Sequence, residues 1–86
     1  MWSKHEDMGH WTIRILRDVY PDGQEYFFPA EVYFHEGEKV PHSYGGFSSE
    51  AETPEDVRWY LQEAIKACDR PILHAGEAFP AKYEPQ

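Results

Sequence analysis

Residues 26–35, YFFPAEVYFH, constrain the fold of this chain more than any other segment. Five of these ten residues are aromatic, and turn-forming residues follow and precede them. Read as a strand, with successive side chains on opposite faces, the segment carries aromatic rings on both faces. A strand with one face in water would alternate apolar and polar residues instead. We therefore expect this strand to be covered on both sides, by a second layer of the domain or by a partner.

Length, charge and cysteine content restrict the class of protein. A chain of 86 residues holds one domain, and the single cysteine, Cys68, excludes an internal disulfide framework. The sequence contains neither an apolar run long enough to cross a membrane nor the apolar core of a signal peptide. These features predict a soluble, intracellular protein, with the cytoplasm as its expected location. The net charge of −8, with basic residues scattered singly, argues against direct binding of nucleic acid.

A β-hairpin precedes the rest of the domain. Residues 11–20 are rich in strand formers, and Pro21, Asp22 and Gly23 form a turn before the aromatic strand. A four-residue loop, 21–24, would pair Tyr20 with Glu25 and place the apolar residues of both strands on one face. That register pairs Trp11 with Phe34, Ile13 with Val32, Ile15 with Ala30, Val19 with Tyr26, Arg14 with Glu31, and His10 with His35. Because Pro29 cannot donate to a ladder, a bulge or a lapse in pairing on one side is expected there.

A third strand and a helix complete the expected domain. Residues 39–44 predict a weaker edge strand, with Val40, His42 and Tyr44 on the packed face, and residues 45–46 end it. Thr53 followed by Pro54 is typical of a helix start. The apolar residues of the helix recur at helical spacing, at Val57, Leu61, Ala64, Ile65 and Cys68. Pro71 ends the helix by residue 69 or 70.

The predicted fold is therefore α+β: a three-stranded antiparallel meander with one C-terminal helix packed on one face. Residues 72–74 either dock on the core or add a short extra strand after the helix. The expected organisation is a flexible N-terminal arm at 1–9, a single α+β domain at 10–74, and an extended, proline-containing tail at 75–86.

Several short motifs occur in order along the chain: Trp11, Ile13, Arg14 and Ile15, Asp22 and Gly23, residues 31–34, residues 53–57, Leu61, and residues 71–73. Together they resemble the motifs of a group of short bacterial proteins with no assigned activity. That group has a strand–strand–strand–helix layout and a Pro-Val/Ile-Leu ending. The resemblance covers about residues 10–74 and implies the fold, but it implies nothing about chemistry.

The residues offer no catalytic constellation. No phosphate-binding glycine loop, cysteine pair or serine with an evident base is present in the sequence. Cys68 falls on the apolar side of the helix and is expected to be an inert core residue. We expect neither an enzyme nor a cofactor. His10 and His35, opposite each other in the predicted hairpin, are a candidate transition-metal pair, although two surface histidines are more often simply neighbours.

Two surfaces are candidates for binding a protein. In the predicted register, the sheet face away from the helix carries Leu16, Tyr20, Phe27, Pro29 and Tyr33, an apolar patch that a partner or the chain termini would cover. Phe27 and Tyr33 would be its anchors. Trp59 is a second candidate, because it falls on the polar side of the helix and tryptophan is enriched at interfaces.

These observations favour a small acidic non-enzymatic protein that binds another protein, or associates with itself as a homodimer through the outer aromatic sheet face. The alternative from a different class is an acidic inhibitor that imitates nucleic acid toward a basic protein, of the phage or plasmid type. A metal-binding role is third. No partner is identified by the sequence.

Overall fold

The computed structural model describes residues 10–85; the predicted arm, 1–9, lies outside the described residues. The elements follow in the order β1 (His10–Val19), β2 (Glu25–Phe34), β3 (Ser43–Gly46), α2 (Pro54–Ala67), β4 (Leu73–His74) and η1 (Gly76–Ala78), the last a short 3-10 helix. The class is α+β, with one helix and a mixed sheet of four strands in the order β3-β2-β1-β4. β4 is the short extra strand after the helix, and it runs parallel to β1. The expected meander of three strands therefore gains a fourth at the β1 edge.

The β1–β2 hairpin has a register that differs by one residue from the predicted one. Val19 pairs with Glu25 and Ile13 pairs with Glu31. The cause lies in the turn, where Tyr20 N donates to Gln24 O at 2.8 Å and Gly23 N donates to Tyr20 O at 2.8 Å. The loop thus has three residues, 21–23, and not the four predicted. Gly23, its last residue, has a φ of 91°. A tight turn followed by one residue of positive φ is a common three-residue hairpin connection.

This one-residue difference exchanges the faces of one strand relative to the other. One face of the sheet, which we call the core face, carries Leu16 of β1 opposite Phe28 of β2. The other, which we call the helix face, carries Trp11, Ile13 and Ile15 of β1 with Phe27, Pro29, Glu31 and Tyr33 of β2. The predicted pairs, Arg14 with Glu31 and His10 with His35, are therefore wrong: Arg14 lies opposite Ala30, and His10 lies opposite Phe34.

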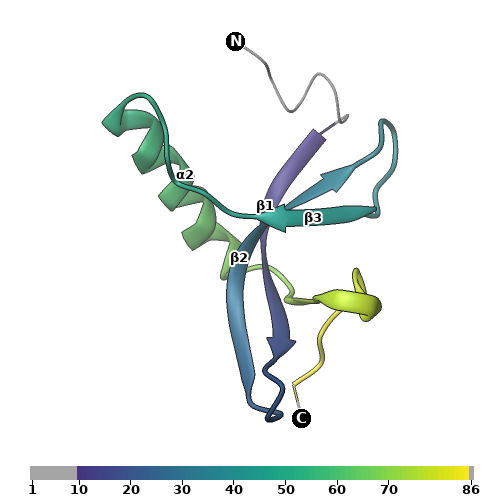
Figure 1. The fold of residues 1–86 in the computed structure, drawn as a ribbon. Coiled ribbons are helices and arrows are strands. Elements are labelled where there is room, and N and C mark those ends of the chain that lie inside the picture. Colours follow the sequence, from purple (N-terminus) through teal and green to yellow (C-terminus); the bar gives the residue numbers. More distant parts are fainter. Residues whose placement is uncertain (1–9, 86) are drawn as a thin grey trace.

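The main core lies on the core face, between the sheet and the C-terminal segment. Its buried residues are Leu16, Ala30, Val32, Phe34, Leu73 and Ala75, with Phe28, Tyr44 and Phe79 packed against them. In Figure 1 this segment, in yellow-green, lies on the opposite side of the sheet from α2. Within the stretch predicted as an extended tail, residues 76–78 form η1 and Gly76 N donates to the Tyr44 hydroxyl at 2.8 Å. The core face of the aromatic strand thus receives a layer, whereas α2 packs on β1, so the helix face of β2 stays partly open at Phe27, which is 47% exposed.

The third strand is shorter than predicted and displaced toward the C-terminus. β3 begins at Ser43 and includes Gly45 and Gly46, which were expected to end it. Val40, expected on the packed face, is 63% exposed. β3 pairs with β2 only as far as Ala30, so pairing on that side stops next to Pro29, as its missing donor predicts.

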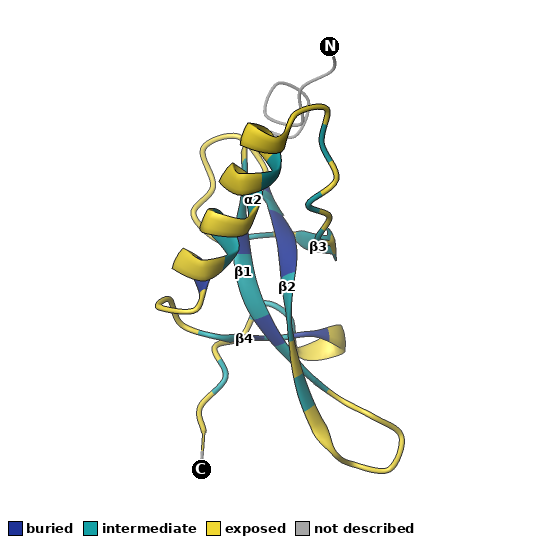
Figure 2. Ribbon diagram, turned by 90° about the vertical axis from the view of Figure 1, so that its left-hand side faces the viewer, coloured by how far each residue is buried: buried dark blue, intermediate teal, exposed yellow. Residues whose placement is uncertain are grey.

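The helix begins where the sequence predicts. Thr53 is the N-cap, its hydroxyl accepts from Asp56 N at 3.1 Å, and Pro54 is the first helical residue. Glu55 and Asp56 lie in the first turn, next to the positive end of the helix dipole. α2 contacts β1 on the helix face of the sheet. Figure 2 shows that α2 is nonetheless exposed along most of its length.

Candidate functional site

The apolar side of α2 is turned toward solvent. Leu61 is 47% exposed and Ile65 is 67% exposed, and Cys68, just after the helix, is also exposed. These three residues lie within about 60° of one another on the helical wheel, so they form one line, which we call the α2 stripe. The prediction that Leu61, Ile65 and Cys68 pack in the core is therefore wrong. Within α2, Ala67 alone is fully buried.

Side-chain size explains this rotation of the helix. Ala67 is 0% exposed, and its small side chain lets the C-terminal half of α2 lie close to β1. In the N-terminal half, Trp11 of β1 stacks on Tyr60 at 6.2 Å between ring centroids and meets the Trp59 ring edge-on at 6.2 Å. Because of these contacts, α2 buries the side that carries Tyr60 and Ala67. The larger aliphatic residues, about a quarter of a turn or more away, are left outside.

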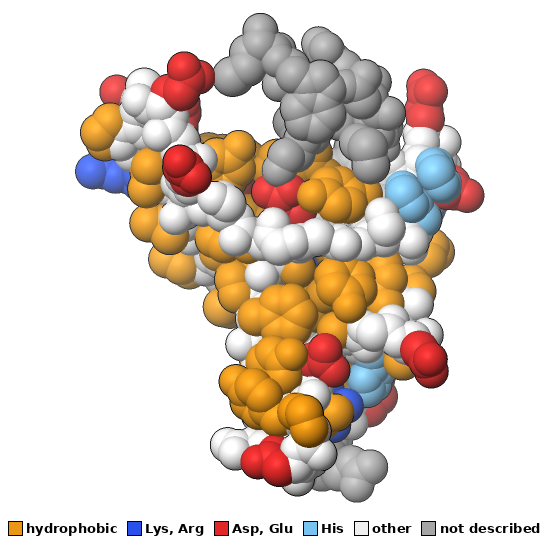
Figure 3. All heavy atoms as spheres, viewed as in Figure 1, with side chains coloured by type: hydrophobic (Ala, Val, Ile, Leu, Met, Phe, Trp, Pro, Cys, Tyr) orange, Lys and Arg blue, Asp and Glu red, His pale blue; other side chains and the backbone are white. Residues whose placement is uncertain are grey.

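A groove adjoins the α2 stripe. It has a volume of about 380 Å³ and is lined almost entirely by apolar side chains: Ile15, Phe27, Phe28, Pro29, Cys68 and Ile72. Cys68 belongs to both the groove and the stripe, so the two form one continuous apolar surface. We refer to them together as the apolar surface. In Figure 3 hydrophobic side chains run down the outer side of α2, at upper left, and continue over the sheet toward the β1–β2 turn at the bottom.

The five residues predicted as protein-binding do not form one patch. Leu16 is 0% exposed and belongs to the main core, so it is no part of any surface. Tyr20 is 50% exposed at the hairpin turn, where it stacks on Tyr26 at 4.2 Å. Phe27 is 47% exposed and lines the groove. The register explains the separation, because Leu16 faces the core side of the sheet and Phe27 the helix side.

Tyr33 lies on the same face as Phe27 but is held by polar contacts. Its hydroxyl donates to Glu31 Oε1 at 2.7 Å, and Glu31 is only 2% exposed. Burial, with the hydrogen bond to Glu31 and the negative charge of that carboxylate, raises the pKa of Tyr33 to about 12. A Cβ at Gly45 would come within 3.2 Å of the Tyr33 hydroxyl, so glycine lets β3 approach this ring closely. Tyr33 therefore fixes β3 and Glu31 and is not an exposed anchor.

Trp59 is 46% exposed, and it lines a pocket in which aromatic and acidic side chains meet. The pocket has a volume of about 410 Å³ and is lined by Glu50, Ala51, Glu52, Asp56, Trp59 and Tyr60. It gathers three carboxylates at the start of α2, beside two aromatic rings whose centroids are 5.1 Å apart.

The two predicted metal ligands are not brought together. The His10 ring stacks on Phe34 at 4.2 Å, whereas the His35 ring stacks on His42 at 3.7 Å. His42, expected in the packed face, is exposed. Within residues 10–85, no three His, Cys, Asp or Glu side chains are grouped so that they could hold a metal ion.

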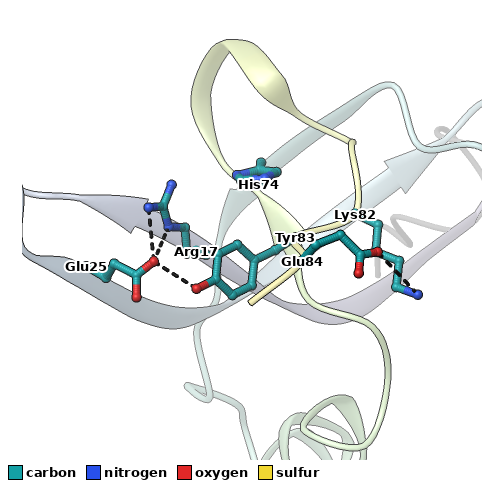
Figure 4. A pocket seen from close by; sticks show the side chains of 6 residues that line it. All are labelled: Arg17, Glu25, His74, Lys82, Tyr83 and Glu84. Atoms are coloured by element: carbon teal, nitrogen blue, oxygen red, sulfur yellow. Dashed lines mark hydrogen bonds and ion pairs between the residues drawn. The ribbon is translucent and has the colours of Figure 1, made fainter. Parts of the chain in front are cut away.

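A polar pocket of about 600 Å³ lies between the C-terminal segment and the hairpin, and contacts among its lining residues join the two. Figure 4 shows its residues: Arg17, Glu25, His74, Lys82, Tyr83 and Glu84. Glu25 Oε2 accepts from the Tyr83 hydroxyl at 2.8 Å and from Arg17 Nε at 3.0 Å. The Arg17 guanidinium also lies 5.3 Å from the centroid of the Tyr83 ring. The hydrogen bond from Tyr83, followed by that from Arg17, lowers the pKa of Glu25, although partial desolvation opposes the shift.

These contacts act on the groove as well. The Tyr83 ring meets Phe27 edge-on at 5.8 Å, so the C-terminal segment supports the outer end of the groove from one side. Tyr83 N donates to Ile72 O at 2.7 Å, which links the same segment to a second groove residue. The main charged groups of this pocket, Arg17 and Glu25, already pair with each other. We therefore interpret the contacts of Arg17, Glu25 and Tyr83 as structural: they attach the C-terminal segment to the hairpin, and we call them the C-terminal latch.

Sequence reasoning missed most of the apolar surface. It proposed Phe27 and Pro29 but placed Leu61, Ile65, Cys68, Ile15 and Ile72 in the core or beside it. The signal that would have corrected the register was Pro21-Asp22-Gly23 itself, since glycine after a tight turn favours the three-residue loop. Nothing in the sequence of α2 distinguished which half of its broad apolar side would be buried.

Comparison with known proteins adds no relationship. No protein-family model, no curated protein and no solved structure matches this chain. The resemblance to short bacterial proteins therefore stays a prediction. Among residues 10–85, no helix is long and apolar enough to cross a membrane.

Proposed function

We propose that this protein is a protein-binding module that acts through the apolar surface, the α2 stripe together with the groove. The observation that carries the proposal is the exposure of Ile65 and Leu61 at adjacent turns of the only long helix among the described residues. Exposed apolar area costs about 25 cal/mol per Å² relative to burial, so a small domain gains stability when such a surface is covered. Contiguous apolar patches of several hundred Å² on soluble domains mark interaction sites.

The surroundings of the apolar surface also support this function. Arg58, Lys66 and Asp69 are exposed on one side of the stripe, which gives that side the polar border typical of protein interfaces. The groove is concave and contains an aromatic side chain, Phe27, whose ring is held at one edge by Tyr83. A partner side chain that entered the groove would replace water against Ile15, Pro29 and Ile72. Apolar burial of this kind, rather than charge, would supply most of the affinity.

Site-specific photo-cross-linking tests this proposal. A photoreactive phenylalanine derivative in place of Ile65 should give cross-linked protein species in cells that express the chain. The matched control is the same residue in place of Val40, which is exposed to a similar extent, 63% against 67%, but lies outside the apolar surface. Equal yields at the two positions, or none at position 65, would contradict the proposal.

A second candidate function rests on the acidic pocket beside Trp59. Glu50, Glu52 and Asp56 line one hollow in a chain of net charge −8. Spaced carboxylates of this kind favour an inhibitor that imitates nucleic acid toward a basic protein. Salt separates the two candidates, because a charge-based complex dissociates as ionic strength rises, whereas an apolar one persists. Loss of a captured partner at high salt, and in the Glu50→Gln/Glu52→Gln variant, would favour the second candidate.

A further inference from the structure

We propose that the partner of the apolar surface is a second copy of this chain, docked with its α2 antiparallel to the first across a twofold axis level with Glu63. This inference rests on the proposed function, because it names the occupant of the same surface. Three observations support it: the symmetry of the stripe, the charges beside it, and its continuity with the groove.

The α2 stripe is complementary to itself. Leu61 and Ile65 lie one turn apart on one side of the helix, at equal distances from Glu63 along the sequence. In an antiparallel pair centred at that level, Leu61 of each copy lies beside Ile65 of the other. A twofold axis repeats the contact, so both side chains of both copies are covered by a single arrangement. Branched aliphatic side chains at this spacing are those that pack between two helices.

The charges beside the stripe also match in this arrangement. Arg58, in α2, and Asp69, in the turn that follows α2, are both exposed; on a helical wheel continued past the end of α2 they fall on the same flank of the stripe, about 20° apart. Neither side chain forms an ion pair or a hydrogen bond with another described residue. The antiparallel alignment places Arg58 of one copy within one residue of direct opposition to Asp69 of the other. The twofold axis makes this pair of opposite charges twice.

The groove extends the contact beyond the helices. At the end of α2, Cys68 and Ile72 line the groove. In the same alignment, the first turn of the second helix, with Pro54 and Val57, comes level with these two residues. Pro54 and Val57, the two apolar residues of the first turn, therefore lie at the groove of the other copy. A parallel pair would instead bring the two grooves together and the two first turns together, so that the first turn of neither helix would reach a groove.

The size and charge of the interface set its strength. The 14 residues of α2 span about 21 Å, so the helix pair alone covers less than the roughly 800 Å² per partner of a standard interface. Each copy carries a net charge of −8, so two copies repel each other at low ionic strength. Dimerisation is therefore expected to depend on concentration and to strengthen as salt screens this repulsion.

Sedimentation equilibrium of the full chain tests the proposal, at several protein concentrations and at low and high salt. The wild type should dimerise, more strongly at high salt. Ile65→Glu should raise the dissociation constant about 100-fold, since the twofold axis applies the change twice. Val40→Glu, the control at a similarly exposed position off the surface, should affect it only by the small repulsion of one added charge. Circular dichroism confirms that each variant is folded.

A charge exchange tests the antiparallel geometry. Arg58→Asp and Asp69→Arg should each weaken the dimer, because each places like charges together. The Arg58→Asp/Asp69→Arg double variant should restore the affinity of the wild type. A dimer that survives Ile65→Glu overturns the interface, and a double variant that stays weak overturns the alignment. A wild type that is monomeric at every concentration overturns self-association, while cross-linking to another protein at Ile65 would leave the proposed function standing.

Discussion

Two leucines of this chain, Leu16 and Leu61, occupy opposite environments, and truncating each of them tests the observed register. Leu16 is 0% exposed in the main core, whereas Leu61 is 47% exposed on the α2 stripe. Leu16→Ala removes the equivalent of three methylenes, which is about 2.4 kcal/mol of transfer free energy at about 0.8 kcal/mol each. The cavity that remains between the sheet and the C-terminal segment adds to this, so we expect a loss of about 3 kcal/mol.

That loss is large for this protein. Folded domains are stable by about 5–15 kcal/mol, and a chain of this length lies toward the lower end. Leu61→Ala should change the free energy of unfolding of the monomer by less than about 1 kcal/mol, because much of that side chain is already in water. Equilibrium unfolding in urea, at a protein concentration low enough to avoid self-association, measures both changes. Equal losses for the two variants, or a loss below about 1 kcal/mol for Leu16→Ala, would refute the register and the assignment of the core face.

Two further predictions concern the helix face and the C-terminal latch. Phe27→Glu should stay folded by circular dichroism and should weaken association. Tyr33→Glu should destabilise the fold, because it places a second carboxylate beside the buried Glu31. If the two variants were equally stable, the different roles given to Phe27 and Tyr33 would be wrong. Because the pKa of Glu25 is lowered in the folded state, its contribution to stability is present above its ordinary pKa of about 4.3 and is lost as the pH falls through the lowered value. Tyr83→Phe removes the largest cause of that shift, the hydrogen bond from the Tyr83 hydroxyl. Urea unfolding between about pH 6 and about pH 3 should therefore show that the variant loses less stability at acidic pH than the wild type. An unchanged pH profile would mean that this hydrogen bond does not stabilise the Glu25 carboxylate.

Local signals in the sequence predicted the elements of the fold but not their relative placement. The start of α2 was predictable because Thr53 and Pro54 act within one turn of the chain, and the structure confirms both. The apolar pattern could not select the register of the hairpin, because β2 carries aromatic residues on both faces and a shift by one residue exchanges one apolar set for another. Only the turn residues 21–23 favoured the observed register. In an ordinary half-buried strand, a polar face would have excluded the shifted register.

The candidate site was less predictable than the fold for a similar reason. An apolar stripe at helical spacing indicates that a helix buries one side, but it does not distinguish burial within the chain from burial against a partner. Which side of α2 is buried depends on Ala67 and on the contact of Trp11 with Tyr60. Because Trp11 and Tyr60 are far apart in the sequence, their contact depends on the packing of the whole sheet. The hydrogen bond between Glu25 and Tyr83 likewise could not be predicted from the sequence, because it joins residues that are far apart in the chain.

The edge strand β4 has a consequence for the order in which the molecule assembles. Leu16 pairs with Leu73, so the core face of the hairpin is completed by residues near the other end of the described chain. The hairpin itself closes through a three-residue loop and costs little chain entropy, whereas docking of β4 and η1 closes a loop that contains every other element. In the hairpin alone, Leu16 and Val32 are uncovered, because Leu73 and Ala75, which pack with them, follow α2 in the chain. Until β4 and η1 dock, the folding chain therefore presents two apolar faces to water, and the docking of residues 73–83 reduces them to one.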